Sequence, residues 1–290
     1  MSLVVDHVTK EFRIRKGFKS SILRAVDDVS FTLEPGKTIA LVGESGSGKS
    51  TIAKLIMRLE QPTRGHITVD GLRSTVRGIK GQKYLHLVQM VYQDPFASLN
   101  PFHTIGHHIE RPLRIHGKAK SREEVDEQVL ELLSRVNLEP AQSYADRNPH
   151  ELSGGQRQRV AIARALAPGA KYLVADEPVS MLDVSIRLSV LNLLARLQRE
   201  DNLGVLYITH DLATARHFSD EIMVLYKGQV VERGPSDEVI LNPQHKYTKL
   251  LLSAAPIPAN HGKLRDSVRA EMAEGGSFDQ FGKNVLAEEE

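Results

Sequence analysis

Cysteine and tryptophan are both absent from this chain of 290 residues. Without cysteine the chain forms no disulfide, no thiolate metal site and no cysteine nucleophile. Its apolar runs, such as residues 205–208, are far shorter than the roughly 20 residues that span a bilayer. Residues 1–10 alternate polar and apolar side chains and lack the apolar core of a secretory signal. We therefore expect a soluble protein, with any membrane role depending on a partner.

Charge shows no strong bias either. The 38 basic residues nearly balance the 36 acidic ones, and the formal net charge is +2. A chain that binds nucleic acid through its overall charge is usually far more basic, although a local basic patch stays possible. We expect no nucleic-acid partner. The hydrophobic fraction of 41% excludes disorder as the main state, and the length predicts one large domain or a domain with appendages.

Strand and helix patterns alternate in most of the chain. Residues 38–42 are apolar on both faces, as a central parallel strand requires. Between about residues 94 and 153 the strand signals fade, and Ser121 with Glu124 forms a capping box before a helical pattern. The alternation then resumes, which predicts an α/β fold with a largely parallel sheet, covered on both faces and interrupted by a helical insert. Further strands are expected at 172–175, 205–209, 221–226 and 229–232, and helices at 49–59, 156–167 and 184–197.

A glycine-rich loop follows the strand at 38–42. Residues 43–50 match the pattern G-x-x-x-x-G-K-[ST], in which backbone N–H groups and the start of the next helix surround phosphate oxygens. In this pattern Lys49 can reach the β- and γ-phosphates, and the Ser50 hydroxyl can bind Mg²⁺. A plain glycine-rich turn is the alternative, but the strand before and the helix after the loop favour phosphate binding. The expected ATP-binding residues are Gly43, Glu44, Ser45, Gly46, Ser47, Gly48, Lys49, Ser50 and Thr51.

Two adjacent acids follow the apolar strand at 172–175. Ligands of open α/β sheets bind at the carboxyl ends of the strands, where Asp176 and Glu177 stand. Because neighbouring strand residues point in opposite directions, Asp176 can face Mg²⁺ while Glu177 addresses a water beyond the γ-phosphate. Alone, two solvated carboxylates would be the better interpretation; beside a phosphate-binding loop, the catalytic one is favoured.

A second anion-binding helix start follows the pattern Leu-Ser-Gly-Gly-Gln at residues 152–156. Ser153, Gly154, Gly155 and Gln156 precede an arginine-rich helix, which they also cap. Ser153 lies 110 residues after Gly43. One nucleotide cannot obviously bind both phosphate cradles, the glycine-rich loop and this helix start, within a compact monomer. The economical solution is a pair of chains in which each cradle completes the other chain's site.

Together these motifs resemble the ATP-binding subunits of ATP-binding-cassette (ABC) transporters. Gln93, residues 180–183 and residues 208–211 match in the expected order, and the resemblance covers about residues 3–256. Residues 93–101 and 242–251 are similar to the dipeptide, oligopeptide and nickel import ATPases. The resemblance implies a P-loop NTPase (RecA-like) core with an N-terminal antiparallel β part. The domains would be a core at 1–93 and 157–235, a helical subdomain at 94–156, and a C-terminal extension at 236–290 that ends in a loosely held tail from about residue 256.

The resemblance also assigns roles. Glu177 would be the catalytic base, with His210 at the γ-phosphate and Gln93 sensing it. Phe12 would stack on adenine, although an ordinary strand aromatic is the alternative. Mg²⁺ would be held by Ser50, Gln93 and Asp176. Across the dimer, ATP would meet Ser153, Gly154, Gly155, Gln156 and Asp183 of the opposite chain.

The implied cofactors are ATP and Mg²⁺. The implied partners are two membrane-spanning permease subunits, a second ATPase that is more often a related chain than an identical one, and, indirectly, an extracytoplasmic solute-binding protein. The chain would lie peripherally on the cytoplasmic face of the cell membrane and drive the import of peptides. Nickel or oligosaccharide uptake stays open, as do a DNA-maintenance ATPase and a catalytically silent ATP-binding partner.

Some residues depart from the family pattern or invite another interpretation. Met181 replaces the usual alanine, Lys246 replaces the usual proline, and the cysteine cluster of several relatives is missing, which excludes an iron–sulfur site. His103, His107 and His108 suggest a metal site. Since only Glu110 accompanies them, solvated or partner-facing histidines are favoured.

Overall fold

A six-stranded sheet organises the protein, which is seen here as a computed structural model that describes residues 1–16 and 19–254. The strand order is β10-β9-β3-β8-β7-β6, and every pair except β9/β10 is parallel. This arrangement confirms the expected mostly parallel sheet. The strands are β3 (Thr38–Val42), β6 (Val88–Val91), β7 (Tyr172–Asp176), β8 (Gly204–Thr209), β9 (Glu221–Tyr226) and β10 (Gln229–Pro235).

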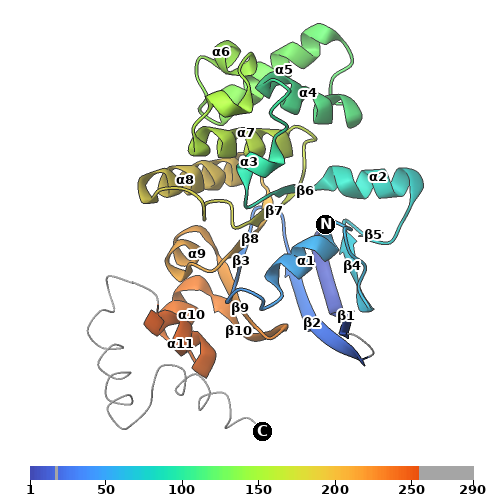
Figure 1. Ribbon diagram of the computed structural model, residues 1–290, viewed down its shortest axis with the longest axis vertical. Helices are drawn as coiled ribbons and strands as arrows, with labels where there is room; N and C mark the ends of the chain where they lie inside the picture. The colour runs from blue at the N-terminus through green and yellow to red at the C-terminus, as the bar shows by residue number, and fades with distance from the viewer. Residues whose placement is uncertain (17–18, 255–290) are drawn as a thin grey trace.

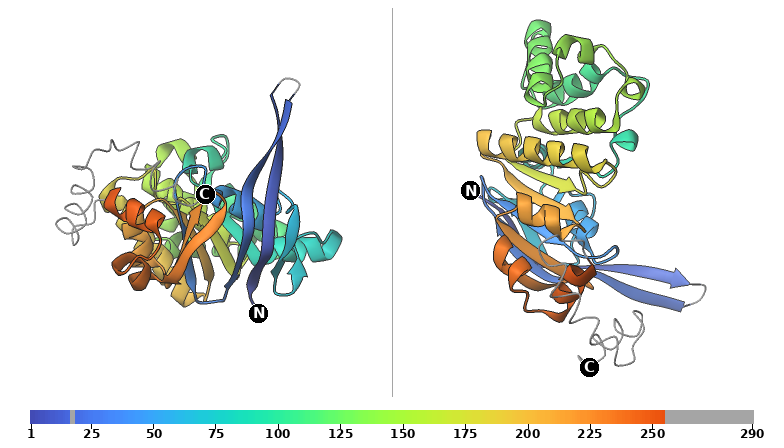
Figure 2. Two further views of the ribbon diagram at one scale, coloured as in Figure 1. Left: turned by 90° about the horizontal axis from the view of Figure 1, so that it is seen from below. Right: turned by 90° about the vertical axis from the view of Figure 1, so that its left-hand side faces the viewer.

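An antiparallel sheet with the order β2-β1-β4-β5 forms the N-terminal part, as expected. The long β1–β2 hairpin extends beyond the rest of the molecule, which Figure 2 shows from two sides. Its strands are β1 (Leu3–Lys16), β2 (Lys19–Leu33), β4 (Arg64–Val69) and β5 (Leu72–Arg73).

Two hydrophobic cores lie on the opposite faces of the six-stranded sheet. Along β3, Ile39 and Leu41 pack into the core shared with the antiparallel sheet, whereas Ala40 and Val42 belong to the core on the other face. This alternation follows from the two-residue period of a strand, and it explains why β3 is apolar throughout. The helices around this part are α1 (Lys49–Ile56), α2 (Gly78–Leu87), α8 (Val184–Glu200), α9 (Leu212–Phe218), α10 (Ser236–Leu241) and α11 (Lys246–Ala254).

Helices gather at one end of the molecule, at the top of Figure 1. The capping box predicted at the start of α5 is present: the Glu124 N–H donates to Ser121 Oγ (3.1 Å), and the Ser121 N–H donates to Glu124 Oε2 (3.3 Å). The helices here are α3 (Pro95–Ser98), α4 (Ile105–Ile115), α5 (Arg122–Arg135), α6 (Ala141–Ala145), the short 3₁₀ helix η1 (Pro149–Glu151) and α7 (Gly154–Leu166).

The domain limits at residues 93, 156 and 235 stay predictions, and the tail expected from about residue 256 lies outside the described residues. Within the described residues, no helix is both long enough and apolar enough to cross a membrane.

Leu133 on α5 tests how the helical end is held together. Its side chain is fully buried in the core that this end shares with the large sheet. We expect Leu133→Ala to lower the free energy of unfolding by about 2–5 kcal/mol, because the change leaves a cavity. Denaturant unfolding followed by circular dichroism measures the effect. Leu59→Ala, at a leucine that is 61% exposed, is the matched control and should cost roughly 0.5 kcal/mol or less. Equal losses in the two variants would contradict this account.

Candidate functional site

Residues predicted to act together follow four neighbouring parallel strands. The loop at 43–48 follows β3, and His210 follows β8. Asp176 ends β7, Glu177 comes next, and Gln93 lies two residues beyond β6. Because β3, β8, β7 and β6 are adjacent in the sheet, their carboxyl ends meet at one edge and bring these segments together.

Buried backbone surrounds the phosphate-loop candidate, and its glycines are required there. A Cβ atom on Gly43 would lie 2.3 Å from the Leu225 carbonyl oxygen, and one on Gly48 would lie 2.3 Å from that of Ala25. Gly48 also has a φ of 112°, which an L side chain rarely adopts. Only glycine fits these two positions without moving the neighbouring strands.

Lys49 is 5% exposed and lies under this loop. Its ammonium group donates to the carbonyl oxygens of Gly43 (2.6 Å) and Glu44 (2.8 Å). Burial lowers the pKa of Lys49, while the nearby charges of Glu177, Asp176 and Glu44 oppose that shift. The lysine is therefore held by neutral acceptors, in a place where a negative ligand would stabilise its charge.

Asp176 and Ser50 face each other across the site, with Ser50 Oγ 3.5 Å from Asp176 Oδ1. Burial raises the pKa of Asp176, and the hydrogen bond from Ser50 only partly offsets this. A half-buried carboxylate with a raised pKa beside a hydroxyl is an oxygen-rich pair that a hard divalent cation would stabilise. The two side chains therefore fit the predicted Mg²⁺ ligands.

Glu177 has contacts with both of its predicted catalytic neighbours. Gln93 Nε2 donates to Glu177 Oε2 (3.1 Å), and His210 Nδ1 lies 3.2 Å from the same oxygen. The φ of Glu177 is 46°, in the left-handed region that non-glycine residues seldom occupy. Such local strain is most often retained at functional sites, where the surrounding structure compensates for it. Three of the predicted catalytic residues thus form one cluster.

The second predicted cradle is a capped helix start. The Gln156 N–H donates to Ser153 Oγ (3.3 Å), and the Ser153 N–H donates to Gln156 Oε1 (2.9 Å). In the part of the chain that the structure describes, no hydrogen bond joins Ser153 to the loop at 43–50. Figure 1 shows α7 and α1 in different layers of the molecule.

Asp183, at the N-cap of α8, belongs to the same neighbourhood as this helix start. A Cβ on Gly154 would lie 3.5 Å from Leu182, and one on Gly155 would meet Ile186. Ser153 and Asp183 are both exposed. The structure therefore groups the residues predicted to act on the opposite chain, and it separates Ser153 from the loop that they would complete.

Phe12 lies on β1, paired in register with Leu23 of β2. The same β2 strand contacts the phosphate loop through Ala25, whose carbonyl oxygen faces Gly48. The Lys10 ammonium group lies 4.7 Å from the Phe12 ring centroid. Phe12 is thus on the hairpin that borders the loop, and its adenine-stacking role stays a prediction.

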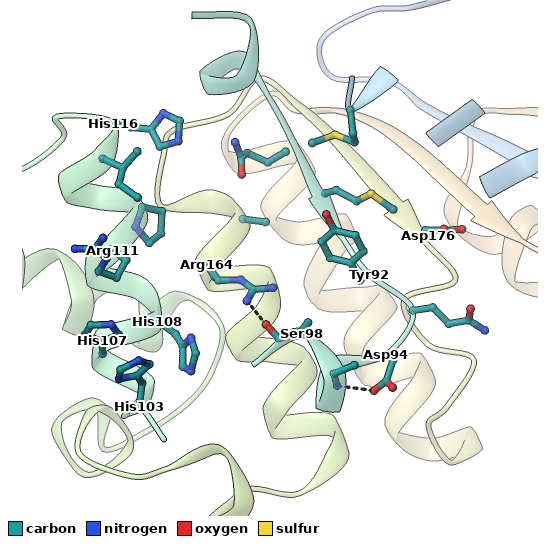
Figure 3. Close-up of a pocket in the computed structure, with 18 residues that line it drawn as sticks. Tyr92, Asp94, Ser98, His103, His107, His108, Arg111, His116, Arg164 and Asp176 are labelled. Atoms are coloured by element: carbon teal, nitrogen blue, oxygen red, sulfur yellow. Dashed lines mark hydrogen bonds between the residues drawn. The ribbon is translucent and has the colours of Figure 1, made fainter. Parts of the chain in front are cut away.

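A groove of about 790 Å³ lies beside the cluster, between α4 and the segment that follows β6. Figure 3 shows four histidines on or next to α4, together with Arg111 of that helix, on one side, with Tyr92, Asp94 and Ser98 on the other. Arg164 of α7 spans the floor and donates to the Ser98 carbonyl oxygen (2.5 Å). Gln93 and Asp176 also line the groove, so it opens directly onto the predicted catalytic residues.

His107 and His108 of α4 and His103, just before this helix, pack on one another. The rings of His103 and His107 stack with centroids 4.2 Å apart, and His108 Nε2 lies 3.0 Å from the Asn100 carbonyl oxygen. Burial is the largest of several influences that lower the pKa of His108. These contacts are those of groove-lining side chains. Among the departures from the family pattern, Met181 is 53% exposed and Lys246 begins α11.

One contact at the loop was not predicted from the sequence. The backbone N–H of Glu44 donates to the hydroxyl of Tyr247 (3.0 Å), across 203 residues of chain. The sequence at 242–251 indicates only a similarity to a family pattern, and nothing in its spacing indicates a contact with the loop. The nearest available signal was that resemblance itself.

Comparison with known proteins agrees with this geometry. Residues 26–180 match the family described as "ABC transporter", and residues 231–282 match "Oligopeptide/dipeptide transporter, C-terminal region". Among solved structures, the ATP-binding cassette MJ0796 in a dimeric post-hydrolysis state bound to ADP and Pi gives a TM-score of 0.70 at 33% identity. That match covers 81% of this chain and 98% of the other.

Curated relatives are more similar in sequence. The oligopeptide transport ATP-binding protein OppF of Bacillus subtilis (strain 168) is 46% identical over 260 residues, which are 88% of this chain and 83% of that protein. The dipeptide transport ATP-binding protein DppF of Haemophilus influenzae is 46% identical over 85% of this chain and 76% of its own. The glutathione import ATP-binding protein GsiA of Pectobacterium atrosepticum is 46% identical over 92% of this chain. The match spans only 43% of the length of GsiA. The chain therefore belongs to the ATP-binding proteins of the ABC transporter family.

Proposed function

We propose that this chain hydrolyses ATP to drive the import of peptides through a membrane transporter. One observation carries the catalytic part of the proposal: Glu177 receives Gln93 and His210 on one carboxylate oxygen, at the sheet edge where Lys49 lies beneath the phosphate loop. Phosphoryl transfer to water requires a base, residues that position it and a cradle for the phosphates, and all of these lie at one edge of the sheet.

Each of these residues has a task in such a reaction. Lys49 and the loop amides hold the β- and γ-phosphates, because a buried cation and aligned N–H groups stabilise negative charge without reorganising. Glu177 accepts a proton from the attacking water as that water approaches the γ-phosphate. His210 contacts the γ-phosphate, and Gln93 links the carboxylate of Glu177 to the groove.

Ser50, Asp176 and Gln93 are the residues that would hold Mg²⁺. Ser50 and Asp176 already face each other, and burial raises the pKa of Asp176 by more than the hydrogen bond from Ser50 and the charges of Lys49 and Lys54 lower it. When bound, Mg²⁺ neutralises charge on the phosphates. The protein's own contribution is to keep the two oxygen donors close to the loop.

A second ATPase chain is part of this proposal. Ser153, Gln156 and Asp183 are grouped away from the loop, so the same residues of a partner chain would have to approach it from outside. We favour a related chain over an identical one for this pair. Hydrolysis would then remove the γ-phosphate contacts between the chains and release the closed state.

The groove next to Gln93 is the proposed attachment point for a membrane-spanning subunit. It lies between α3 and α4, and a cytoplasmic helix of that subunit would fill its 790 Å³. An occupant would contact the segment that carries Gln93, which is hydrogen-bonded to Glu177. The chain would thus lie peripherally on the cytoplasmic face of the membrane, attached to one of the two permease subunits of the transporter.

Peptides are the proposed solute class. OppF, DppF and GsiA carry names that refer to oligopeptide, dipeptide and glutathione transport, and all three solutes are peptides. An extracytoplasmic solute-binding protein would select the peptide and deliver it to the membrane subunits. The ATP-binding chain supplies the energy and does not itself contact the solute.

Glu177→Gln tests the assignment of the base. We expect ATP turnover to fall by about 10²–10⁴, since an amide cannot accept the proton, while ATP still binds. Phosphate release by the assembled pair of ATPase chains and ATP binding to the purified chain are measured separately, which distinguishes the two effects. Glu123→Gln, on the exposed side of α5, is the matched control and should hydrolyse ATP normally. Normal turnover in Glu177→Gln would refute the assignment.

Asp176→Asn tests the proposed metal ligand through stability. Because burial raises the pKa of Asp176 in the folded chain, its ionised form destabilises the fold above that pKa. This penalty disappears below the unfolded pKa of 3.8. We expect Asp176→Asn to raise the melting temperature of the nucleotide-free chain at pH 8. The increase should shrink as the pH falls. The variant should also lose the further stabilisation that MgATP gives the unmodified chain.

Asp126→Asn, at an exposed aspartate of α5, is the control for this experiment. It should leave both the melting temperature and the MgATP effect unchanged. A nucleotide-free Asp176→Asn protein that melts below the unmodified chain at pH 8, or one that MgATP still stabilises fully, would argue against the assignment.

Ala97→Lys tests the docking groove. Ala97 is exposed on α3 and lines the groove, so a lysine there adds both bulk and charge. In reconstituted vesicles we expect peptide uptake to fall at least tenfold, while ATP affinity of the isolated chain stays unchanged. Gln142→Lys, on the exposed face of α6 outside the groove, should transport normally. Full uptake by Ala97→Lys would exclude this contact.

A further inference from the structure

A tyrosine near the end of the described chain contacts the phosphate loop. Tyr247 of α11 is 2% exposed, and its hydroxyl accepts a hydrogen bond from the Glu44 N–H (3.0 Å). None of the roles assigned above uses this contact. It nevertheless joins the loop to a segment at the far end of the described chain.

This hydrogen bond acts on the peptide unit that also holds Lys49. The C=O of Gly43 and the N–H of Glu44 belong to one peptide group, and a trans peptide points them in opposite directions. Lys49 donates to that C=O (2.6 Å), while Tyr247 accepts from that N–H (3.0 Å). The peptide plane is thus held from both edges, and each hydrogen bond polarises the amide in the sense that strengthens the other.

The tyrosine is itself firmly held. The centroid of its ring lies 4.3 Å from the ring centroid of Tyr226. The turn before α11 is anchored by Glu232, whose carboxylate accepts from the N–H groups of Gln244 (2.7 Å) and His245 (3.0 Å). Burial raises the pKa of Tyr247 to about 12, so the hydroxyl stays protonated at neutral pH. The Tyr247 hydroxyl, which accepts the hydrogen bond from the loop, is therefore held in place by contacts outside the loop.

We propose that Tyr247 is a positioning residue for Lys49. By fixing the Gly43–Glu44 peptide plane, it keeps the lysine between two carbonyl oxygens, ready to bind phosphate. The inference rests on the proposed function, in which Lys49 binds the phosphates of ATP. It gives the C-terminal extension a role at the nucleotide site: movement of α11 would be transmitted to the lysine through one peptide group.

Tyr247→Phe removes only the hydroxyl and keeps the ring contact with Tyr226. Two measurements on the purified chain test the proposal: MgATP affinity, and the rate at which a limiting acetylating reagent modifies Lys49 without nucleotide, followed by peptide mass spectrometry. We expect roughly 3- to 10-fold weaker ATP binding, the effect of about one hydrogen bond, and several-fold faster acetylation of Lys49.

Tyr172→Phe is the matched control. It removes the hydroxyl of another buried tyrosine, whose hydrogen bond goes to Asp70 (2.9 Å), away from the loop. We expect this variant to fold like Tyr247→Phe, as judged by circular dichroism, and to leave ATP affinity and Lys49 acetylation unchanged. A general loss of stability would affect both variants, whereas a positioning role affects only Tyr247→Phe.

Each other outcome for Tyr247→Phe has a definite meaning. Unchanged ATP affinity, with or without faster acetylation, would overturn the proposal. Weaker ATP binding with unchanged acetylation of Lys49 would also overturn it, because the tyrosine would then act by another route. Lys49→Ala is measured beside these variants: if it binds ATP normally, the proposed function of the loop fails, independently of Tyr247.

Discussion

The parallel pairing of β3, β8, β7 and β6 is the constraint on which the candidate site depends. Parallel strands end at the same edge, so segments that are far apart in sequence become neighbours there. The pairing is maintained by hydrophobic cores on both faces of the sheet, which leave little freedom for one strand to slide past another. The hydrogen bond between Gln93 and Glu177, across 84 residues, is a direct result.

Secondary structure and motif positions could be predicted because each rests on local chemistry. The strand at 38–42, the capping box of Ser121 and the loop at 43–50 all depend on residues within a few positions of one another. The paired acids lie at a strand end, where the sequence predicts them, for the same reason. A family resemblance then assigned Gln93 and His210, and the structure places both beside Glu177.

Contacts made by tertiary packing were beyond the reach of the sequence. The Tyr247 hydroxyl meets Glu44 only because α11 returns to the sheet edge after β10, and no periodicity encodes such a return. The groove is likewise formed by α4 and the segment after β6, which come together through the folding of the helical end. The left-handed φ of Glu177 is also imposed by its surroundings, since glutamate itself does not favour it.

Buried charged groups at the site destabilise the folded chain when no ligand is bound. Burial lowers the pKa of Lys49 and raises that of Asp176, so the fold disfavours the charged form of each. The buried hydroxyl of Ser47 has no hydrogen-bond partner among the described residues. Phosphate oxygens beside Lys49 and a divalent cation beside Asp176 would reverse both penalties. The same groups that weaken the free chain would therefore strengthen the binding of its ligand, which is how a site can be poorly stabilised alone and tightly closed when occupied.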